Sequence, residues 1–222
     1  LDSLSGRLIV RAKPTERLDI VLKVTGGRGK PVQAGAHHVG NTPDGTNPFT
    51  GYNRRQDNLG FWDVRHPTVG YNDVKAVGGQ MVVSYELTDD LTISTLTAYD
   101  WADQVLTQEA TAATTPHFLD TSYGDTYNQF NQEVRLIYSK GSLNVQAGGY
   151  YGWDKVDNHD EYGLVGTTFI KQHFIQTRKS KAVFAQVDYD LTSHLGITGG
   201  IRYTEDKGRF GDAFGMISPD AN

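Results

Sequence analysis

The 222-residue sequence contains no cysteine and no long hydrophobic run. Without cysteine, disulfide frameworks, thiolate metal sites and cysteine nucleophiles are all excluded. A membrane-spanning helix needs about 20 consecutive apolar residues, and no stretch of the sequence approaches that length. This excludes a helical membrane protein. A transmembrane β-strand needs an apolar residue only at every second position, so a barrel stays compatible with the sequence.

An excess of positive charge and the common catalytic motifs are also missing. Lysine and arginine number 21 against 26 aspartate and glutamate, a formal net charge of -5, so charge gives no reason to expect nucleic acid as a partner. The sequence has no G-x-S-x-G, P-loop, H-E-x-x-H or zinc-finger spacing. We therefore expect no enzymatic activity and no cofactor.

A short polar turn recurs four times along the chain, with roughly 3–5 residues in each turn. The runs that follow it alternate. After the last turn, Leu195, Ile197 and Ile201 share one face, while Thr198 and Arg202 share the other. Period 2 indicates strands with one apolar and one polar face. We count about eight such strands of roughly 9–12 residues, close to the 9–11 that a tilted transmembrane strand needs. The turns lie within residues 12–20, 85–93, 138–145 and 189–197.

Long polar, glycine-rich connections alternate with these short turns. We predict them at residues 26–76, 102–126 and 155–179. Connections longer than about 15 residues are uncommon in compact soluble domains. Outer-membrane barrels, in contrast, have short periplasmic turns and long extracellular loops.

Aromatic residues gather at both ends of the predicted strands. Such bands are typical of the two membrane–water interfaces, and the alternative is that they cap the core of a soluble β-sandwich. The band near the turns comprises Tyr85, Tyr138 and Tyr189, and the far band comprises Tyr99, Trp101, Tyr151, Trp153 and Tyr203.

The predicted polar face carries charges of both signs, which a filled sandwich core could not hold without a large desolvation cost. We expect this face to line a water-filled lumen. Its members are Arg7, Arg11, Lys23, Glu86, Glu133, Arg135, Gln146, Gln186, Asp188 and Arg202.

Particular residues also resemble a known family. The segment from Phe130 to Leu136, Phe-Asn-Gln-Glu-Val-Arg-Leu, resembles a strand of TonB-dependent receptors that commonly reads F-x-Q-E-x-R-L. Other segments resemble neighbouring strands and hairpins of the same family. These are residues 91–99, 143–151, 182–192 and 199–207.

The resemblance implies an all-β, antiparallel up-and-down transmembrane barrel of about 22 strands with an N-terminal plug. Members lie in the outer membrane of Gram-negative bacteria and import a scarce ligand: siderophore–iron, cobalamin, haem or an oligosaccharide. Energy comes from TonB–ExbB–ExbD through the plug region. We expect residues 1–222 to be a partial barrel domain of about eight strands, without the plug, TonB box or terminal strand. The implied partners are outer-membrane lipid, TonB–ExbB–ExbD through the missing plug, and a small extracellular ligand.

Ligand-binding residues are expected in the first long connection. Exposed aromatic side chains in a long loop often meet a ligand or a partner, although packing within the loop is the alternative. The candidates are Arg54, Arg55, Phe61, Trp62 and Tyr71. His37–His38 is a weaker candidate for binding a metal or haem, because neighbouring histidines in an extended loop usually point apart. His159–Asp160–Glu161 is a weaker candidate for binding a cation, and there the sequence favours a solvated acidic loop.

The sequence leaves two further architectures open. Eight strands can close into a complete small barrel. A soluble β-sandwich or carbohydrate-binding module would also show alternating strands. A receptor barrel fits the loop lengths, strand lengths and aromatic bands together.

Overall fold

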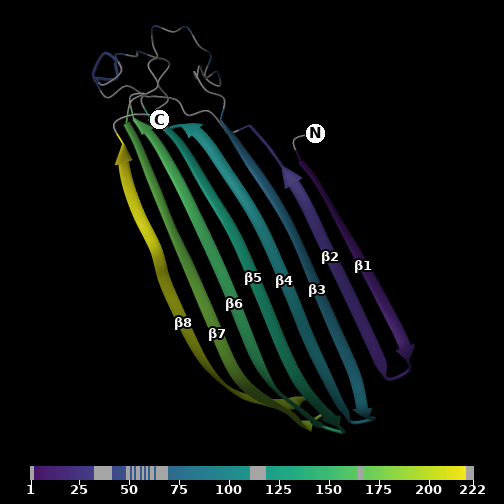
Figure 1. The fold of residues 1–222 in the computed structure, drawn as a ribbon. Coiled ribbons are helices and arrows are strands. Elements are labelled where there is room, and N and C mark those ends of the chain that lie inside the picture. Colours follow the sequence, from purple (N-terminus) through teal and green to yellow (C-terminus); the bar gives the residue numbers. More distant parts are fainter. Residues whose placement is uncertain are drawn as a thin grey trace.

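A computed structural model of the chain contains eight antiparallel strands (Figure 1). It describes residues 3–32, 42–48, 51, 53, 56, 58, 60, 63, 70–110, 119–164 and 168–218. No helix in these residues is long and apolar enough to cross a membrane. The strands are β1 (Ser3–Thr15), β2 (Leu18–Gly29), β3 (Tyr71–Thr88), β4 (Leu91–Glu109), β5 (Leu119–Lys140), β6 (Leu143–Leu164), β7 (Thr168–Thr192) and β8 (Leu195–Ser218).

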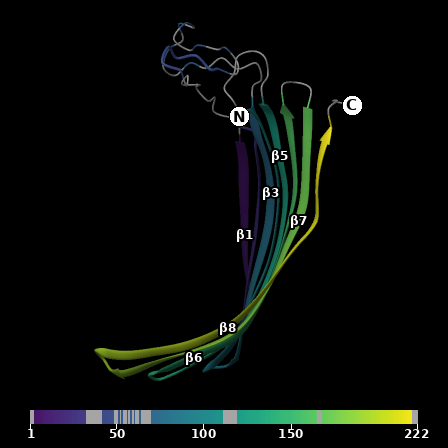
Figure 2. The same cartoon turned by 90° about the vertical axis from the view of Figure 1, so that its left-hand side faces the viewer.

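The strands form one curved sheet in which each strand pairs with its sequence neighbours (Figures 1 and 2). The start of β1 and the end of β8 lie at the end of the sheet opposite the tight turns (Figure 1). Within the described residues, β1 and β8 do not pair with each other, and no second sheet covers the first. The eight strands therefore adopt neither a closed small barrel nor a β-sandwich.

Large apolar side chains do not form a protein core. In the described part of the chain, Ala182 is the only buried hydrophobic residue, and no large side chain is fully buried. Leu8 is 62% exposed and Ile201 is 78% exposed. A soluble sheet would bury such a face against a second layer. Because nothing in the sheet covers these side chains, the apolar face needs a non-aqueous surrounding.

Two residues separate the strands at each of the four tight turns, fewer than the predicted 3–5. The strand ladders continue closer to the turns than the sequence suggested, and three hairpins have a register shift at the turn. The β5–β6 hairpin is regular, since Lys140 pairs with Leu143. Gly141 there has φ of 56°, the conformation that the first central residue of a II′ turn requires. The positions of all four turns agree with the prediction.

Most strands are much longer than the predicted 9–12 residues, so that expectation was wrong. β5 and β6 have 22 residues each, β7 has 25 and β8 has 24. The predicted connections shrink accordingly. β4 and β5 together occupy most of residues 102–126, and β6 and β7 leave only three residues between them.

The extra strand length lies on the side of the sheet away from the tight turns. In β6 the apolar face runs through Val145, Tyr151 and Trp153, and then continues as Lys155 and Asp157. Beyond this point charged and polar residues interrupt both faces, although Val156 and Tyr162 remain, so the regular hydrophobic alternation stops while the hydrogen-bonded ladder goes on. The part of the sheet near the tight turns is called the turn-side half, and it comprises residues 7–25, 77–101, 128–153 and 179–203. The part beyond it is called the loop-side half, and it comprises residues 26–29, 71–76, 102–109, 119–127, 154–164, 168–178 and 204–218.

Candidate functional site

The polar face of the turn-side half is continuous across the sheet. All ten residues that the sequence assigned to it lie opposite the apolar face, because directly paired residues point to the same side. One cross-strand row of this face comprises Asp19, Ser84, Ser94, Arg135, Gly148, Phe184 and Arg202.

Ion pairs and cation–aromatic contacts connect the charges on this face. Arg11 donates to both carboxylate oxygens of Asp19, and Arg135 donates to Glu133. Arg202 lies 5.6 Å from the ring centroid of Phe184, with Arg135 on the same ring at 6.0 Å. These side chains contact one another, and no other part of the described chain covers them. Such a surface can line a hydrated passage.

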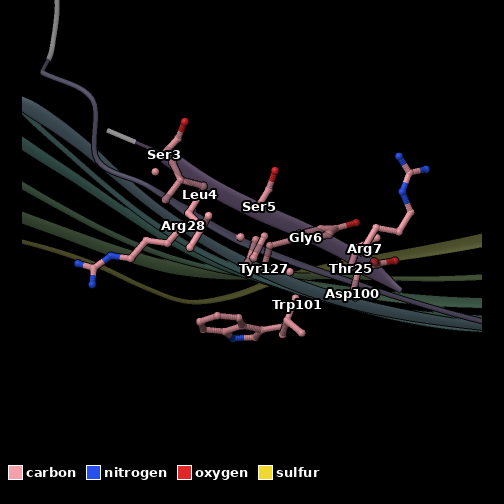
Figure 3. Close-up of a pocket in the computed structure, with 18 residues that line it drawn as sticks. Ser3, Leu4, Ser5, Gly6, Arg7, Thr25, Arg28, Asp100, Trp101 and Tyr127 are labelled. Atoms are coloured by element: carbon pink, nitrogen blue, oxygen red, sulfur yellow. The ribbon is translucent and has the colours of Figure 1, made fainter. Parts of the chain in front are cut away.

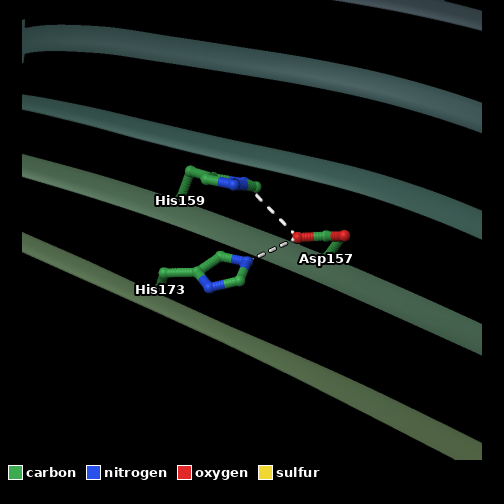
Figure 4. A group of neighbouring side chains, drawn as sticks. All are labelled: Asp157, His159 and His173. Carbon is green, nitrogen blue, oxygen red and sulfur yellow. Dashed lines mark hydrogen bonds and ion pairs between the residues drawn. The ribbon is translucent and has the colours of Figure 1, made fainter. Parts of the chain in front are cut away.

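A second group of polar side chains lies on the loop-side half, on the continuation of the apolar face beyond Trp153. Asp157, His159 and His173, which we call the histidine cluster, come together there from β6 and β7 (Figure 4). His173 Nε2 lies 2.9 Å from Asp157 Oδ1, and His159 Nδ1 lies 3.5 Å from the same oxygen. The two imidazole rings are 4.3 Å apart between centroids.

The cluster differs from the trio proposed from the sequence. His159, Asp160 and Glu161 lie within β6 and not in a loop. Strand alternation puts Asp160 on the opposite face, so the three cannot converge on one cation. Direct pairing of His159 with His173 supplies the second ring instead. The spacing Asp157-x-His159 carried a local signal, but the partner strand of His173 did not follow from the sequence.

The carboxylate at the centre of this cluster is stabilised in its charged form. Burial raises the pKa of Asp157, but hydrogen bonds from Lys155 and His173 lower it more, so the pKa lies below its usual value. Lys155 Nζ contacts Oδ2 at 3.0 Å, which leaves Oδ1 facing the two imidazoles.

A shallow hollow of about 810 Å³ lies across the loop-side ends of β1, β2 and β3 and the middle of β4, and Tyr127 of β5 also lines it (Figure 3). Ser5 and Arg7 point to one side of the sheet there and Trp101 to the other (Figure 3). Several of the residues that line the hollow are glycines, among them Gly26 and Gly78, so few side chains fill it. The hollow adjoins the unpaired edge of β1, which exposes backbone groups able to pair with a further strand.

An ion pair lies beside this hollow, on the loop-side half. Arg28 Nη2 contacts Asp73 Oδ2 at 2.7 Å between β2 and β3. The hydrogen bond from Arg28 holds the pKa of the Asp73 carboxyl below its usual value. This pair joins the two strands beyond the level at which the apolar face ends.

Most of the ligand-binding candidates lie outside the described residues. This applies to Arg54, Arg55, Phe61 and Trp62, as well as to His37–His38. Tyr71 is the first residue of β3, and the ammonium group of Lys30 lies 4.1 Å from its ring centroid. Its pairing with Thr107 places it on the same face as Tyr99 and Trp101 and not on the polar face. A role of these residues in ligand binding stays a prediction.

Comparisons with known proteins agree on the architecture. Residues 23–222 match the family described as TonB dependent receptor-like, beta-barrel. The ferric yersiniabactin uptake receptor FyuA from Yersinia pestis superposes with a TM-score of 0.72 at 13% identity, over 97% of this chain and 34% of that one. The ferric citrate transporter FecA gives 0.67 at 11% identity, over 98% and 32%.

A third solved structure is similar but superposes less closely. BauA, the ferric preacinetobactin receptor from Acinetobacter baumannii, gives a TM-score of 0.57 at 10% identity, over 97% of this chain and 36% of that one. No curated protein sequence matches. The chain spans about a third of the length of these solved structures. At such low identities the likeness shows a shared fold alone.

Proposed function

Because the chain belongs to the TonB-dependent receptor family through its β-barrel domain, we propose that it forms part of the wall of an outer-membrane receptor. This receptor imports a ferric siderophore into a Gram-negative bacterium. The family is one of receptors, and the proposal includes no enzymatic step.

The observation that carries this proposal is the single-layer sheet with an uncovered apolar face and a charged opposite face. The apolar face of β6 runs ten residue steps, from Leu143 to Trp153. At about 3.4 Å per residue and a tilt of about 40°, this corresponds to a height of about 26 Å. The apolar band of outer-membrane barrels is about 25 Å tall. Lipid therefore fits as the partner of this face, and enclosed water as the partner of the other.

The relatives in structure support an iron chelate as the ligand. FyuA, FecA and BauA are named for ferric yersiniabactin, ferric citrate and ferric preacinetobactin. Within the family's range of ligands, this favours siderophore–iron over cobalamin, haem and oligosaccharides. The proposed ligand contacts are Arg54, Arg55, Phe61 and Trp62 of the first connection, together with Tyr71 at the start of β3.

Import against a gradient requires energy, which the proposal assigns to TonB–ExbB–ExbD. That contact involves the plug region, which is not among the described strands. The strands of this chain provide the fixed wall, and the polar face gives the passage its hydrated lining.

The test compares three strains of the source bacterium: wild type, a deletion of the gene for the full-length protein, and a deletion of the tonB gene. Each strain receives a panel of radioactive-iron-loaded siderophores, with cyanocobalamin and haem as comparators. We expect one ferric siderophore to be taken up by the wild type alone. Loss of cyanocobalamin or haem uptake in the gene deletion, with all iron chelates unaffected, would contradict the ligand class.

A matched measurement tests the membrane location. Heat-modifiable mobility on an unboiled gel, together with recovery in the outer-membrane fraction, is the expected behaviour of the full-length protein. Recovery of the folded protein in the soluble fraction would overturn the receptor proposal altogether.

A further inference from the structure

We propose that the histidine cluster of Asp157, His159 and His173 binds a divalent late transition-metal ion, with Zn²⁺ as its representative. The site lies on the outer surface of the wall, beyond Trp153, and on the opposite side of the sheet from the polar face. It is therefore separate from the passage that the proposed function assigns to the ligand.

The sheet positions the three donors without help from a loop. Asp157 and His159 are two residues apart on β6 and therefore share a face. His173 on β7 is the direct cross-strand partner of His159. Sites built on paired strands are held more firmly than sites on loops.

The two distances from Asp157 Oδ1 to the imidazole nitrogens bracket the spacing that a tetrahedral ion requires. Zinc bonds of about 2.0–2.1 Å place neighbouring ligand atoms about 3.3 Å apart. Here Asp157 Oδ1 lies 2.9 Å from His173 Nε2 and 3.5 Å from His159 Nδ1, and the three donor atoms all lie within 4.8 Å of one another. Small side-chain rotations bring them to bonding distance, and three protein ligands leave a position for water.

The donor set favours a late transition metal over Ca²⁺ or Mg²⁺. Two imidazoles and one carboxylate suit Zn²⁺, Cu²⁺ or Ni²⁺, whereas calcium and magnesium prefer oxygen ligands throughout.

Neighbouring residues hold two of the donors in place. Lys155 binds Oδ2 of Asp157 at 3.0 Å, which fixes the carboxylate with Oδ1 toward the rings. The Phe214 ring lies 5.4 Å from that of His173, whose side chain is only 16% exposed. His159 is 65% exposed and is free to turn onto an ion.

A β-bulge puts Phe214 in this position. Ile175 pairs with Gly211, but His173 pairs with Phe214, so β8 contains one extra residue at this point. Asp212 within the bulge has φ of 53°, a left-handed conformation that is uncommon outside glycine. Without the extra residue Ala213 would lie opposite His173. Bulges often re-aim side chains beside functional sites.

Nearby charge does not prevent cation binding. Lys171, on the same face, is paired with Glu161 at 3.0 Å. Lys155 already shares its charge with the carboxylate oxygen that faces away from the imidazoles. A bound ion would add a bridge between β6 and β7 and would stabilise the folded wall by mass action.

The experiment titrates Zn²⁺ into the metal-stripped full-length protein in detergent, by isothermal titration calorimetry. The variants are His173→Ala and Asp157→Asn. The matched controls are His194→Ala, in the exposed β7–β8 turn, and Asp160→Asn, on the opposite face of β6. All proteins are first checked for the folded form on an unboiled gel.

We expect a Zn²⁺ site in the wild type and both controls whose affinity falls at least tenfold in His173→Ala and in Asp157→Asn. Visible absorption of a tetrahedral Co²⁺ complex should disappear in the same two variants. Equal affinity in the wild type and these variants would overturn the proposal, as would a wild type that binds no Zn²⁺. Because no siderophore is present, failure here leaves the ferric-siderophore test unaffected.

Discussion

The turn-side and loop-side halves of the sheet consist of the same strands with the same hydrogen-bonded ladders, but they carry different side chains on one face. In β6 the face that carries Tyr151 and Trp153 in the turn-side half carries Lys155, Asp157 and His159 in the loop-side half. In β8 the same change falls between Tyr203 and Glu205. Backbone pairing therefore continues through both halves, while the character of the side chains on this face changes between them.

Polar groups on the apolar face find partners on that face, both near the boundary between the halves, at Tyr99, and further inside the turn-side half, at Thr97. Tyr99 Oη donates to Asn128 Oδ1 at 2.9 Å, and Thr97 Oγ1 donates to Gln132 Oε1 at 2.6 Å. A phenol with a wet end and an apolar ring suits such a boundary. Substitutions in each half test this difference, and the measured quantity is the free energy of unfolding of the full-length protein in lipid vesicles.

The largest effect is expected from a charge in the middle of the apolar face of the turn-side half. Val183→Arg places a guanidinium on the apolar face, where the Val183 side chain is 61% exposed and where the proposed function puts lipid. We expect a loss of about 2–4 kcal/mol. The control Gln186→Arg, on the polar face of the same strand, should change the stability little. Equal costs for the two variants would mean that the faces are assigned wrongly.

A smaller effect is expected at Gly148, where the turn-side half is tightly packed. A Cβ there would lie 2.6 Å from the Val134 carbonyl oxygen and 2.6 Å from Phe184 Cζ. Gly148→Ala should cost about 1–3 kcal/mol because backbone must move. At Gly149 the nearest atom to a Cβ is the Ala182 carbonyl oxygen at 3.8 Å, so Gly149→Ala is the matched control. A neutral Gly148→Ala would show that the strands separate there without strain.

The next effect concerns the tight turn that joins β5 and β6. Gly141 has φ of 56° and open space around it, so Gly141→Ala tests backbone strain alone. We expect a cost of about 1–2 kcal/mol, since an L-residue in this conformation is strained. Gly208→Ala, in a loop-side strand with equally open space and no positive φ, should be close to neutral. Similar values for both would argue against the II′ geometry.

The smallest effect is expected from a charge on the same face in the loop-side half. Val105→Arg introduces a guanidinium opposite Asp73 on β3, in a region surrounded by water. The cost should be about 0–1 kcal/mol, far below that of Val183→Arg. A loss as large as that of Val183→Arg would place this part of β4 within the membrane and would move the boundary between the two halves.

The sequence predicted the class of fold, the eight strands, the four turns and the two faces, because alternation and turn chemistry are local. It misplaced the strand ends. Between Lys155 and Lys179 charged and polar residues are mixed with scattered apolar ones, such as Phe174 and Ile175 on the two faces, so no regular alternation separates a strand from a loop, yet β6 extends to Leu164 and β7 begins at Thr168. The ligand-binding candidates Arg54 and Trp62 stay predictions, since they lie outside the described residues.

The alternation along the chain was enough to predict which side chains share the apolar face and which share the polar face, because each strand residue points opposite to its neighbour whatever its partner strand does. The identity of the residues that face each other across the ladders came from the tertiary structure. His159 meets His173 through the register of β6 with β7, and Phe214 joins them through a bulge in β8. Register and bulges depend on hydrogen bonds between residues distant in the chain, and no local pattern records them.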